Sequence, residues 1–540
     1  MTTAGPPTRW SEARSRRGVV AAPHALAAAT GRDILRAGGT ALDAAVAAVA
    51  DLAVVYPHMN GIGGDSFWLI FDGRRGTVAA LNAAGRAAAA ADPETYRARF
   101  GGRMPVRGGP AALTVPGTVS GWWEVHRYSV EKLGSTLSWP RLLEGALAHA
   151  RDGVPLSDGQ RRNAVAAAAL FVDSAPPEVR RTLWPVYHPA NLESGRLVQR
   201  DLAASVEAIA RDGAEALYGG ALGRRIAAAA AAAGSPLRLE DLVRHRPVWV
   251  APVRMAYRTG VAVSFPPPTQ GFAALAILGI LDHFDVGGLP EDAYIHLVVE
   301  ATKLAFEDRD RFLADPTFVD VPVDRCLDRA YLAQRARAID PSRARPVGGT
   351  APGGDTIALV TADDQGHAVC VIQSLYHEYG SGVVADGTGI ILQNRGAFFS
   401  LEPSHPNCLA PGKQTAHTLI PSMYLAGDRP RFVYGTMGGE GQPQTQAALV
   451  TRLVDRGYGL QAAVEAPRWL LGRTWGDETR ALRLEGRAGT SIEEALLARG
   501  HDVKTVEPWS DLMGHVQAIE RGETLQAASD PRADGGAESA

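Results

Sequence analysis

Gly353-Gly354-Asp355-Thr356-Ile357-Ala358-Leu359-Val360-Thr361 is the stretch from which the fold of this chain is inferred. A small, polar, flexible approach leads to one threonine, and that threonine opens an apolar run typical of a β-strand. Residues 363–366, Asp-Asp-Gln-Gly, predict a hairpin turn, and residues 367–374 predict the returning strand. We therefore expect a β-hairpin that has Thr356 at its open end.

A threonine in this position becomes a nucleophile if the chain is cut immediately before it. The new α-amine then lies within reach of its own hydroxyl and can act as the base. Because an α-amine has a pKa of roughly 7.7–8.0, a useful fraction is neutral near pH 7. The flexible Gly353-Gly354 pair would let the carbonyl of Asp355 bend toward the hydroxyl of Thr356. The local pattern also fits an ordinary strand threonine, so the hypothesis depends on the rest of the chain.

Composition describes a globular protein and excludes several functional classes. The 540 residues could form two or more domains or one large α/β body. Hydrophobic residues make up 46% of the chain and charged residues 21%, which is usual for a globular protein. The formal net charge of −3 argues against a nucleic-acid-binding surface as the main function.

The cysteines and the N-terminal region add further expectations. Cys326, Cys370 and Cys408 lie far apart without a CxxC pair, so neither a disulfide framework nor a zinc site is indicated. Residues 1–17 have no apolar core of the kind a secretory signal needs. The apolar span 41–56 contains two aspartates and is too short to cross a bilayer. We therefore expect a cytoplasmic protein without a membrane partner.

Several elements can be placed along the chain. Residues 24–37 predict a helix that ends at Gly38-Gly39, and Thr40 with Asp43 forms a capping box for a second, apolar helix. The loop 57–65 is rich in glycine but has neither GxxxxGK[ST] nor GxGxxG, so it indicates a tight turn rather than a nucleotide site. Residues 139–233 are mostly helical, and residues 261–265 predict a strand.

Three further segments bear on function. The charges of the predicted helix 294–312 indicate a solvated face with i,i+4 pairs. Residues 340–354 form the clearest linker, and it leads directly to Thr356. Gly438-Gly439 lies between a predicted strand and a predicted helix, where backbone N–H groups can hold an oxyanion. After Arg532 the composition predicts a disordered tail.

Together these residues resemble the γ-glutamyltransferase family of N-terminal-nucleophile hydrolases over nearly the whole chain. The motifs that carry the resemblance occur in one order: 38–46 (GGTALDAAV), Pro57-His58 with 61–64 (GIGG), 115–117 (VPG), the Asp355-Thr356 junction, 380–382 (GSG), 438–439 (GG) and 528–532 (ASDPR). Each motif is weak alone, and the ordered set is specific.

The resemblance implies an α+β fold, a four-layer αββα sandwich. It also implies a precursor that cleaves itself between Asp355 and Thr356. The products would be a large chain, 1–355, and a small chain, 356–540, which stay paired as a heterodimer because the sheets are shared between them. No metal or organic cofactor is implied, and the substrate would be a small-molecule amide.

The resemblance also assigns roles to individual positions. Thr356 matches the nucleophile, Ser374 matches a supporting hydroxyl residue, and Gly438 and Gly439 match the oxyanion glycines. The reaction would be acyl transfer, in which water or an amine resolves a threonyl ester.

The substrate-binding positions depart from the family pattern. The arginine that the family uses for an α-carboxylate is shifted to Arg86, and Phe398 stands where an acidic residue would hold an α-amine. A pair of serines is replaced by His417-Thr418. An α-amine against Phe398 without a counter-charge would be costly. Arg86 and Arg395 are therefore candidates for binding a carboxylate on an acyl group that lacks the amine, as in glutaryl-type acylases of the same family.

Several functions remain open at this point. One is hydrolysis or transfer of γ-glutamyl or related amides, and another is a glutaryl- or cephalosporin-type acylase. Cleavage of other bonds, including carbon–carbon bonds, and a non-catalytic family scaffold are further alternatives. A serine hydrolase using Ser381 lacks the G-x-S-x-G context and ranks last.

Overall fold

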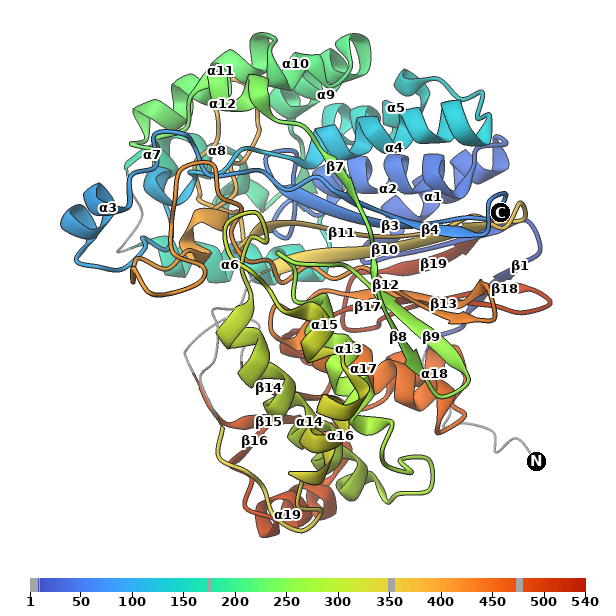
Figure 1. Ribbon diagram of the computed structural model, residues 1–540. Helices are drawn as coiled ribbons and strands as arrows, with labels where there is room; N and C mark the ends of the chain where they lie inside the picture. Colours follow the sequence, from blue (N-terminus) through green and yellow to red (C-terminus); the bar gives the residue numbers. More distant parts are fainter. Residues whose placement is uncertain (1–7, 9, 173–176, 348–354, 473–478) are drawn as a thin grey trace.

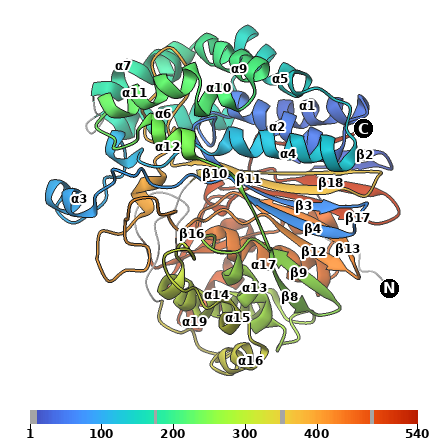
Figure 2. The same ribbon diagram turned by 45° about the horizontal axis from the view of Figure 1, so that its top comes forward.

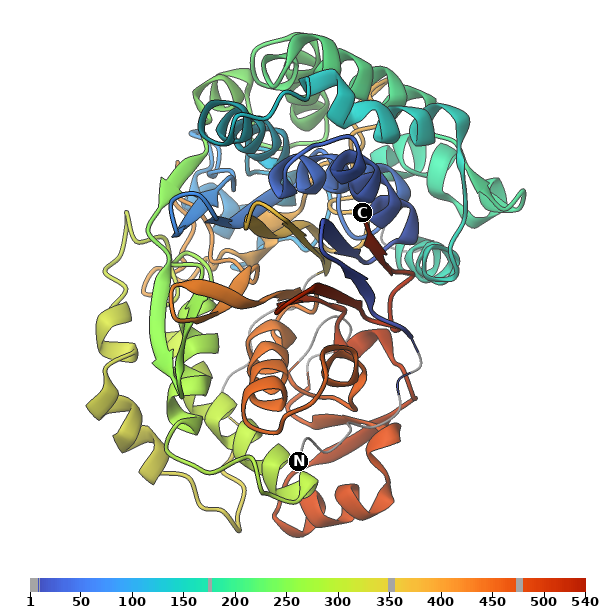
Figure 3. The same ribbon diagram turned by 90° about the vertical axis from the view of Figure 1, so that its right-hand side faces the viewer.

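The computed structural model describes residue 8 and residues 10–172, 177–347, 355–472 and 479–540. Within these residues, none of the helices is both long and apolar enough to cross a membrane. Two seven-stranded sheets lie face to face at the centre, with helices above and below (Figure 1). Figure 3 shows the strands between these two helical layers from the side.

Both central sheets are antiparallel. The first has the order β19-β2-β10-β11-β3-β4-β7. Its strands are β2 (Gly18–Ala22), β3 (Asp65–Asp72), β4 (Thr77–Asn82), β7 (Val248–Val250), β10 (Asp355–Asp363), β11 (Ala368–Tyr376) and β19 (Gly536–Ser539). The second has the order β1-β18-β17-β13-β12-β9-β8. Its strands are β1 (Ala13–Ser15), β8 (Val253–Tyr257), β9 (Gly260–Ser264), β12 (Ser422–Ala426), β13 (Arg429–Thr436), β17 (Val516–Arg521) and β18 (Leu525–Ser529).

The outer layers are helical, and their order in the chain is visible from the colours of Figure 2. The layer on the first sheet includes α1 (Ala25–Arg36), α2 (Ala41–Val55), α4 (Thr118–Leu133), α5 (Trp139–Asp152) and α9 (Arg200–Asp212). The layer on the second sheet includes α13 (Gly271–Leu281), α14 (Glu291–Phe312), α16 (Arg329–Arg337), α17 (Gly441–Val454) and α18 (Leu460–Glu465). The αββα sandwich expected from the sequence is therefore confirmed.

Smaller elements complete the described chain. The helices are α3 (Pro93–Phe100), α6 (Asp158–Val172), α7 (Pro177–Thr182), α8 (Trp184–Tyr187), α10 (Glu215–Tyr218), α11 (Ala221–Ala232), α12 (Leu239–Arg244), α15 (Val323–Cys326), α19 (Thr490–Ala498) and the 3-10 turn η3 (Arg395–Phe398). The strands β14 (Trp469–Leu471), β15 (Leu482–Glu485) and β16 (Val503–Val506) form a small sheet, and β5 (Val154–Pro155) pairs with β6 (Arg196–Leu197).

Side-chain alternation explains why the strand after Thr356 is apolar throughout. Ile357 and Leu359 pack in the core under the helices of the first layer, whereas Ala358 and Val360 pack in the core between the two sheets. Successive side chains of a strand point to opposite faces, so a strand with both faces buried needs a continuous apolar run. The run therefore places β10 in the interior of the sandwich.

Strands from both sides of the Asp355–Thr356 bond are interleaved in each sheet. In the first sheet, β10 and β11 lie between β2 and β3, which come from the N-terminal part of the chain. In the second sheet, β12 pairs with both β9 and β13. A chain cut at that bond would thus remain joined by main-chain hydrogen bonds across both sheets.

Several local predictions are confirmed, and two are wrong. Thr40 and Asp43 form the expected capping box, and every residue of α2 is buried. The charged face of α14 is not solvated: Glu300, Lys303 and Arg309 are all buried. They point into ion pairs rather than into solvent, which spacing alone does not reveal.

The C-terminal segment is likewise ordered rather than disordered. Residues 536–539 form β19, which pairs with β2 at the edge of the first sheet. The small and polar residues of this segment do not predict a strand. An edge strand is ordered by main-chain pairing, which side-chain composition does not reveal.

A buried ion network fixes the segment before β19. Arg532 donates to Glu485 at 2.6 Å and to Asp530 at 3.0 Å, and Arg468 also pairs with Asp530. Burial alone would raise the pKa of Asp530, but the two guanidinium groups lower it to about 2. The network ties the small sheet, helix α18 and the end of the chain together.

We expect Asp530→Asn to destabilise the protein by about 3–5 kcal/mol near pH 7, because it leaves buried guanidinium charge without its partner. The folded pKa of Asp530 lies below the unfolded value of about 3.9, so its contribution is present above pH ~4 and is lost as the pH falls toward ~2. Melting temperatures measured across this range test the sign. Asp152→Asn, at an exposed pair with Arg151, is the matched control; equal melting temperatures of the two variants would contradict the assignment.

Candidate active site

Thr356 lies in an irregular step of the central hairpin. The ladder between β10 and β11 pairs Asp355 with Tyr376 and Ile357 with Gln373, so its register shifts at Thr356. Such a bulge re-aims a side chain, and it is common next to active sites. Thr356 is 1% exposed. Its hydroxyl therefore belongs to the interior of the sandwich.

Ser374 is the closest polar partner of Thr356 that the hairpin supplies. The two hydroxyl oxygens are 3.4 Å apart, which is long for a hydrogen bond. The Ser374 oxygen also accepts from the backbone N–H of Tyr376 at 2.8 Å and from Nη2 of Arg395 at 3.2 Å. These donors fix the position of the Ser374 hydroxyl beside Thr356.

A glycine-rich turn supports Ser374 from the neighbouring strand. A Cβ on Gly64 would lie 2.2 Å from the backbone oxygen of Ser374, and one on Gly63 would lie 2.0 Å from that of Ile391. Only glycine allows backbones to approach so closely. The turn predicted at 57–65 is thus a packing element, and it leads directly into Asp65, the first residue of β3.

Tyr376 ends the hairpin in a strained conformation. Its φ is 84°, in the left-handed region that a bulky residue rarely adopts. Its ring stacks on His377 and lies against the guanidinium of Arg395, 4.4 Å from ring centroid to Cζ. This turn of the chain places Arg395 and Ser374 on the same side of the strand end.

Arg395 is a buried cation with unmet hydrogen-bonding capacity. It is fully buried, and within the described residues its Nε and Nη1 have no hydrogen-bond partner. Burial lowers its pKa to about 10, against the opposing effects of Asp65 and Tyr376, so the guanidinium stays charged at neutral pH. A buried charge with unmet donors is costly unless an anion binds to it.

Gly438 and Gly439 connect β13 to α17 with φ values of 133° and 50°. These values suit glycine, and they turn the backbone at the N-terminal end of the helix, where N–H groups favour negative charge. The structure thus places the glycine pair at a helix N-terminus, and their oxyanion role stays a prediction.

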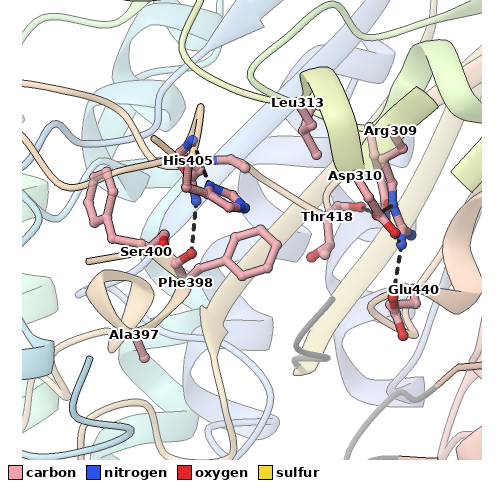
Figure 4. A pocket seen from close by; sticks show the side chains of 13 residues that line it. Arg309, Asp310, Leu313, Ala397, Phe398, Ser400, His405, Thr418 and Glu440 are labelled. Atoms are coloured by element: carbon pink, nitrogen blue, oxygen red, sulfur yellow. Dashed lines mark hydrogen bonds and ion pairs between the residues drawn. The ribbon is translucent and has the colours of Figure 1, made fainter. Parts of the chain in front are cut away.

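A cavity of about 300 Å³ lies beside this turn (Figure 4). One side carries Ala397 and Phe398. The opposite side carries Arg309, Asp310, Leu313 and Glu440, and Thr418 lies between the two sides. The cavity therefore has an apolar side and an ionic side.

The charged side chains of the ionic side pair with one another. Arg309 pairs with Asp310 at 2.7 Å and with Glu440 at 3.0 Å, and it also donates to Gln270. Both carboxylates that line the cavity are thus ion-paired with one guanidinium. The segment 394–399 that carries Phe398 contains no acidic residue, and the acidic residues of the cavity are Asp310 and Glu440.

His417 and Thr418 take different positions. Thr418 lines the cavity, whereas the His417 ring is fully buried behind it, against Phe67. Its Nε2 is 3.4 Å from Oδ2 of Asp65, outside hydrogen-bonding geometry. Burial and the charge of Arg395 lower the pKa of His417 to about 4, although Asp65 opposes the shift. The imidazole is neutral at physiological pH.

Arg86 lies apart from the other candidate residues. Its half-exposed side chain forms an ion pair with Asp315 at 3.1 Å and donates to the carbonyl of Gly412. It is not among the residues that line the cavity. The structure thus brings together Thr356, Ser374 and Arg395, which are not among the residues that line the cavity either, and places Phe398 and Thr418 in the cavity wall.

Four residues of this region were not identified from the sequence: Asp65, Tyr376, Arg309 and Glu440. Asp65 and Glu440 each follow a double glycine, which is a usable signal for a side chain at a tight turn. Arg309 was assigned to a solvated helix face, and Tyr376 carries no pattern that predicts its left-handed backbone.

A cluster on α14 has donor atoms of the kind that bind metal ions. Ligand atoms of His296, Glu300 and His501 lie within 4.8 Å of one another. However, Lys303 donates to Glu300 at 2.7 Å, and the two imidazoles contact each other at 2.8 Å. An ammonium group at the carboxylate disfavours binding of a cation. The cluster is therefore better described as a buried hydrogen-bonded contact than as a metal site.

An αββα sandwich whose central hairpin opens on a buried threonine defines the class of N-terminal-nucleophile hydrolases. The family model described as gamma-glutamyltranspeptidase matches residues 27–540. The chain therefore belongs to the γ-glutamyltranspeptidase family.

Its similarity to individual relatives extends over the whole length. It is 44% identical to the oxamate amidohydrolase proenzyme of Klebsiella pneumoniae, covering 97% of this chain and 98% of that protein. It is 42% identical to a glutathione hydrolase-like proenzyme of Bacillus subtilis, covering 96% and 98%. The crystal structure of the cephalosporin acylase of Bacillus halodurans superposes with a TM-score of 0.91 at 33% identity, covering 100% and 99%. The family thus supports an amidohydrolase or acylase activity in a protein made as a proenzyme.

If the chain is cut before Thr356, as the sequence predicts, we expect Ser374→Ala to slow that cleavage by about tenfold or more. The substitution removes the hydroxyl that contacts Thr356 and that Arg395 holds, and such charge-assisted hydrogen bonds are worth about 1.5–3 kcal/mol. Time-resolved denaturing gels of freshly purified precursor measure the rate.

Ser381→Ala is the matched control for this variant. Ser381 is also a buried serine, but its hydroxyl donates to the carbonyl of Leu392. Its replacement should leave the cleavage rate close to that of the wild type. Equal slowing in both variants would show that Ser374 has no special role.

Proposed function

We propose that this protein is a self-processing amidohydrolase in which Thr356 is the nucleophile and the acyl group of the substrate carries a carboxylate that Arg395 binds. The observation that carries the proposal is the chain of contacts from Thr356 through Ser374 to Arg395. A buried guanidinium with unmet donors, one hydroxyl away from the nucleophile, is a receptor for an anion.

Maturation would begin with an N-to-O acyl shift. The Thr356 oxygen attacks the Asp355 carbonyl, the C–N bond breaks, and the nitrogen takes up the proton to become a free α-amine. Water then hydrolyses the Asp355 ester, which releases a carboxylate on residue 355 and regenerates the hydroxyl. The bulge and the contact with Ser374 hold the nucleophile in place for both steps.

Substrate hydrolysis would repeat this chemistry with an external amide. The α-amine accepts the hydroxyl proton while the Thr356 oxygen attacks the amide carbonyl, and backbone N–H groups at Gly438 and Gly439 stabilise the oxyanion. The leaving nitrogen takes the proton and departs as an amine or ammonia. Water then hydrolyses the threonyl ester and releases the acid.

The site favours a short acyl group with a carboxylate over a γ-glutamyl group. A γ-glutamyl group carries an α-ammonium, and the carboxylates of the cavity, Asp310 and Glu440, are already ion-paired with Arg309. Because Arg395 contacts the same serine as Thr356, a carboxylate bound by it would lie only one or two carbons from the attacked carbonyl. Oxamate, which the Klebsiella relative is named for, has this arrangement.

An acylase activity on bulkier side chains is the second candidate. The observation that favours it is the cavity with its apolar wall, because its volume of about 300 Å³ is larger than a two-carbon acid requires. Glutaryl-type amides would place their chain along Phe398 and Leu313. In either case the cut chains 1–355 and 356–540 would stay together through the interleaved sheets.

Intact mass of the purified protein tests the nucleophile. We expect two fragments whose new N-terminus is Thr356, and a single uncut chain in Thr356→Ala because the attacking oxygen is missing. Thr356→Ser keeps an oxygen and should be cut, so it controls for disturbance of the fold. Cleavage of the alanine variant at the same bond would disprove the mechanism, and an uncut wild type would favour the scaffold alternative.

Comparison of oxamate with oxamide tests the carboxylate receptor. The two amides have nearly the same size, but oxamide lacks the negative charge. We expect Arg395→Gln to lower kcat/KM for oxamate relative to oxamide by about 30-fold or more, since loss of a buried charge partner costs about 2–5 kcal/mol.

Arg86→Gln is the control, and it should leave this ratio unchanged because its side chain pairs with Asp315. An unchanged ratio in Arg395→Gln would refute the receptor. Faster hydrolysis of glutaryl amides than of oxamate by the wild type would favour the acylase candidate.

A further inference from the structure

Three buried ionisable side chains meet behind Thr418. Asp65 comes from the start of β3, Arg395 from η3, and His417 from the segment that follows Gln414; all three are fully buried. Their contacts are unequal, because Oδ1 of Asp65 accepts from the backbone of Gly85 at 2.9 Å and from the side chain of Gln393 at 3.0 Å. Oδ2 is left facing His417 at 3.4 Å.

His417 is held in place by its backbone rather than by its ring. Its N–H donates to the carbonyl of Pro268 at 2.7 Å, and its carbonyl accepts from the N–H of Gln270 at 3.0 Å. Within the described residues neither ring nitrogen has a hydrogen-bond partner. A buried imidazole kept only for packing would be expected to have its polar atoms paired. His58 and His515 share this state, and what distinguishes His417 is a carboxylate oxygen, Oδ2 of Asp65, 3.4 Å from its Nε2.

The charges of the cluster balance before any ligand binds. Asp65 contributes one negative charge and Arg395 one positive charge, and His417 is neutral because burial and Arg395 lower its pKa. A substrate carboxylate at Arg395 would leave one uncompensated negative charge in a buried space. The same carboxylate would cancel the repulsion between Arg395 and a protonated His417.

We propose that His417 takes up one proton when a carboxylate binds at Arg395, with Asp65 as the counter-charge that stabilises the imidazolium. This inference rests on the proposed function, and it adds that the site accepts an acid together with a proton. His417 is thus a positioning residue that sets the charge of the receptor, and Asp65 holds its place through Gly85 and Gln393.

Few other groups bear on the titration of His417. Among the described side chains, Asp65 of β3 and Arg395 of η3 are the charged groups whose electrostatic effect on His417 is resolved. His417 also contacts the ring of Phe67 and the backbone of Pro268 and Gln270. The α-amine of Thr356, which the proposed cleavage would free, is a second group that could take up the proton.

The sign of the effect follows from linkage. Carboxylate binding raises the pKa of His417, so the ligand binds more tightly as the pH falls between the values of the bound and free states. Affinity should change by up to about tenfold per pH unit across that interval. At pH values above that interval, the carboxylate binds without a proton and more weakly than at lower pH.

Lactate is the probe, because it is a three-carbon monocarboxylate without an amide to cleave. Its competitive Ki against oxamate hydrolysis is measured on the processed enzyme from about pH 5.5 to about pH 8, where lactate stays ionised. Calorimetry in two buffers of different ionisation enthalpy counts the protons. We expect the wild type to take up close to one proton per lactate at the lower end and its Ki to rise with pH.

Two variants assign the proton. His417→Gln cannot titrate, so its proton uptake should vanish and its Ki should become nearly independent of pH. Asp65→Asn removes the negative charge, so lactate should bind without a proton and more tightly than to the wild type at about pH 8. Self-cleavage of each variant reports that it has folded, and if one variant does not fold, the other decides.

The outcomes separate this inference from the proposed function. Suppose that lactate binds the wild type without proton uptake and does not bind Arg395→Gln. This result would overturn the role of His417 and leave the receptor intact. Proton uptake that persists in His417→Gln would assign the proton to the α-amine of Thr356 and also overturn it. Binding that is unaffected in Arg395→Gln would instead remove the proposed receptor itself.

Discussion

The position of the Ser374 oxygen is the constraint on which the site depends. It receives the backbone N–H of Tyr376 and the guanidinium of Arg395 while it contacts Thr356. Tyr376, whose N–H makes the first of these contacts, has a left-handed backbone, and the turn at Gly64 packs closely against the backbone of Ser374. Local strain and glycine packing thus both lie at the point where a charge, a hydroxyl and a threonine come together in the buried interior.

The polar residues around this point divide into two environments of different character. On the cavity side, Arg309 forms ion pairs with both Asp310 and Glu440. On the inner side, Arg395 retains unmet donors, and Asp65, the carboxylate that acts on it, accepts hydrogen bonds from Gly85 and Gln393. In the function proposed above, specificity for a charged ligand would come from the inner side, and the cavity wall would set the size and polarity of the remainder of the substrate.

The sequence predicted elements with a strong local signal and missed those that depend on distant contacts. Three elements can be predicted from a few adjacent residues: the apolar run after Thr356, the capping box at Thr40 and the glycine turn before Asp65. The burial of Arg309 and the pairing of β19 depend on partners more than a hundred residues away, Glu440 and β2. Likewise, Arg86 and Arg395 are equivalent in sequence terms, and only tertiary contacts show that one pairs with Asp315 and the other with Ser374.

The interleaving of strands around the Asp355–Thr356 bond bears on quality control during synthesis. The Ser374 that contacts Thr356 lies on β11, which pairs with β3, made early, and it also accepts from Arg395, made late. The last strand, β19, then closes the sheet beside β2. In the mechanism proposed above, a chain that is incomplete or wrongly folded has no competent nucleophile and stays uncut. Maturation would thus act as a checkpoint internal to the molecule, in which only correctly assembled copies become active.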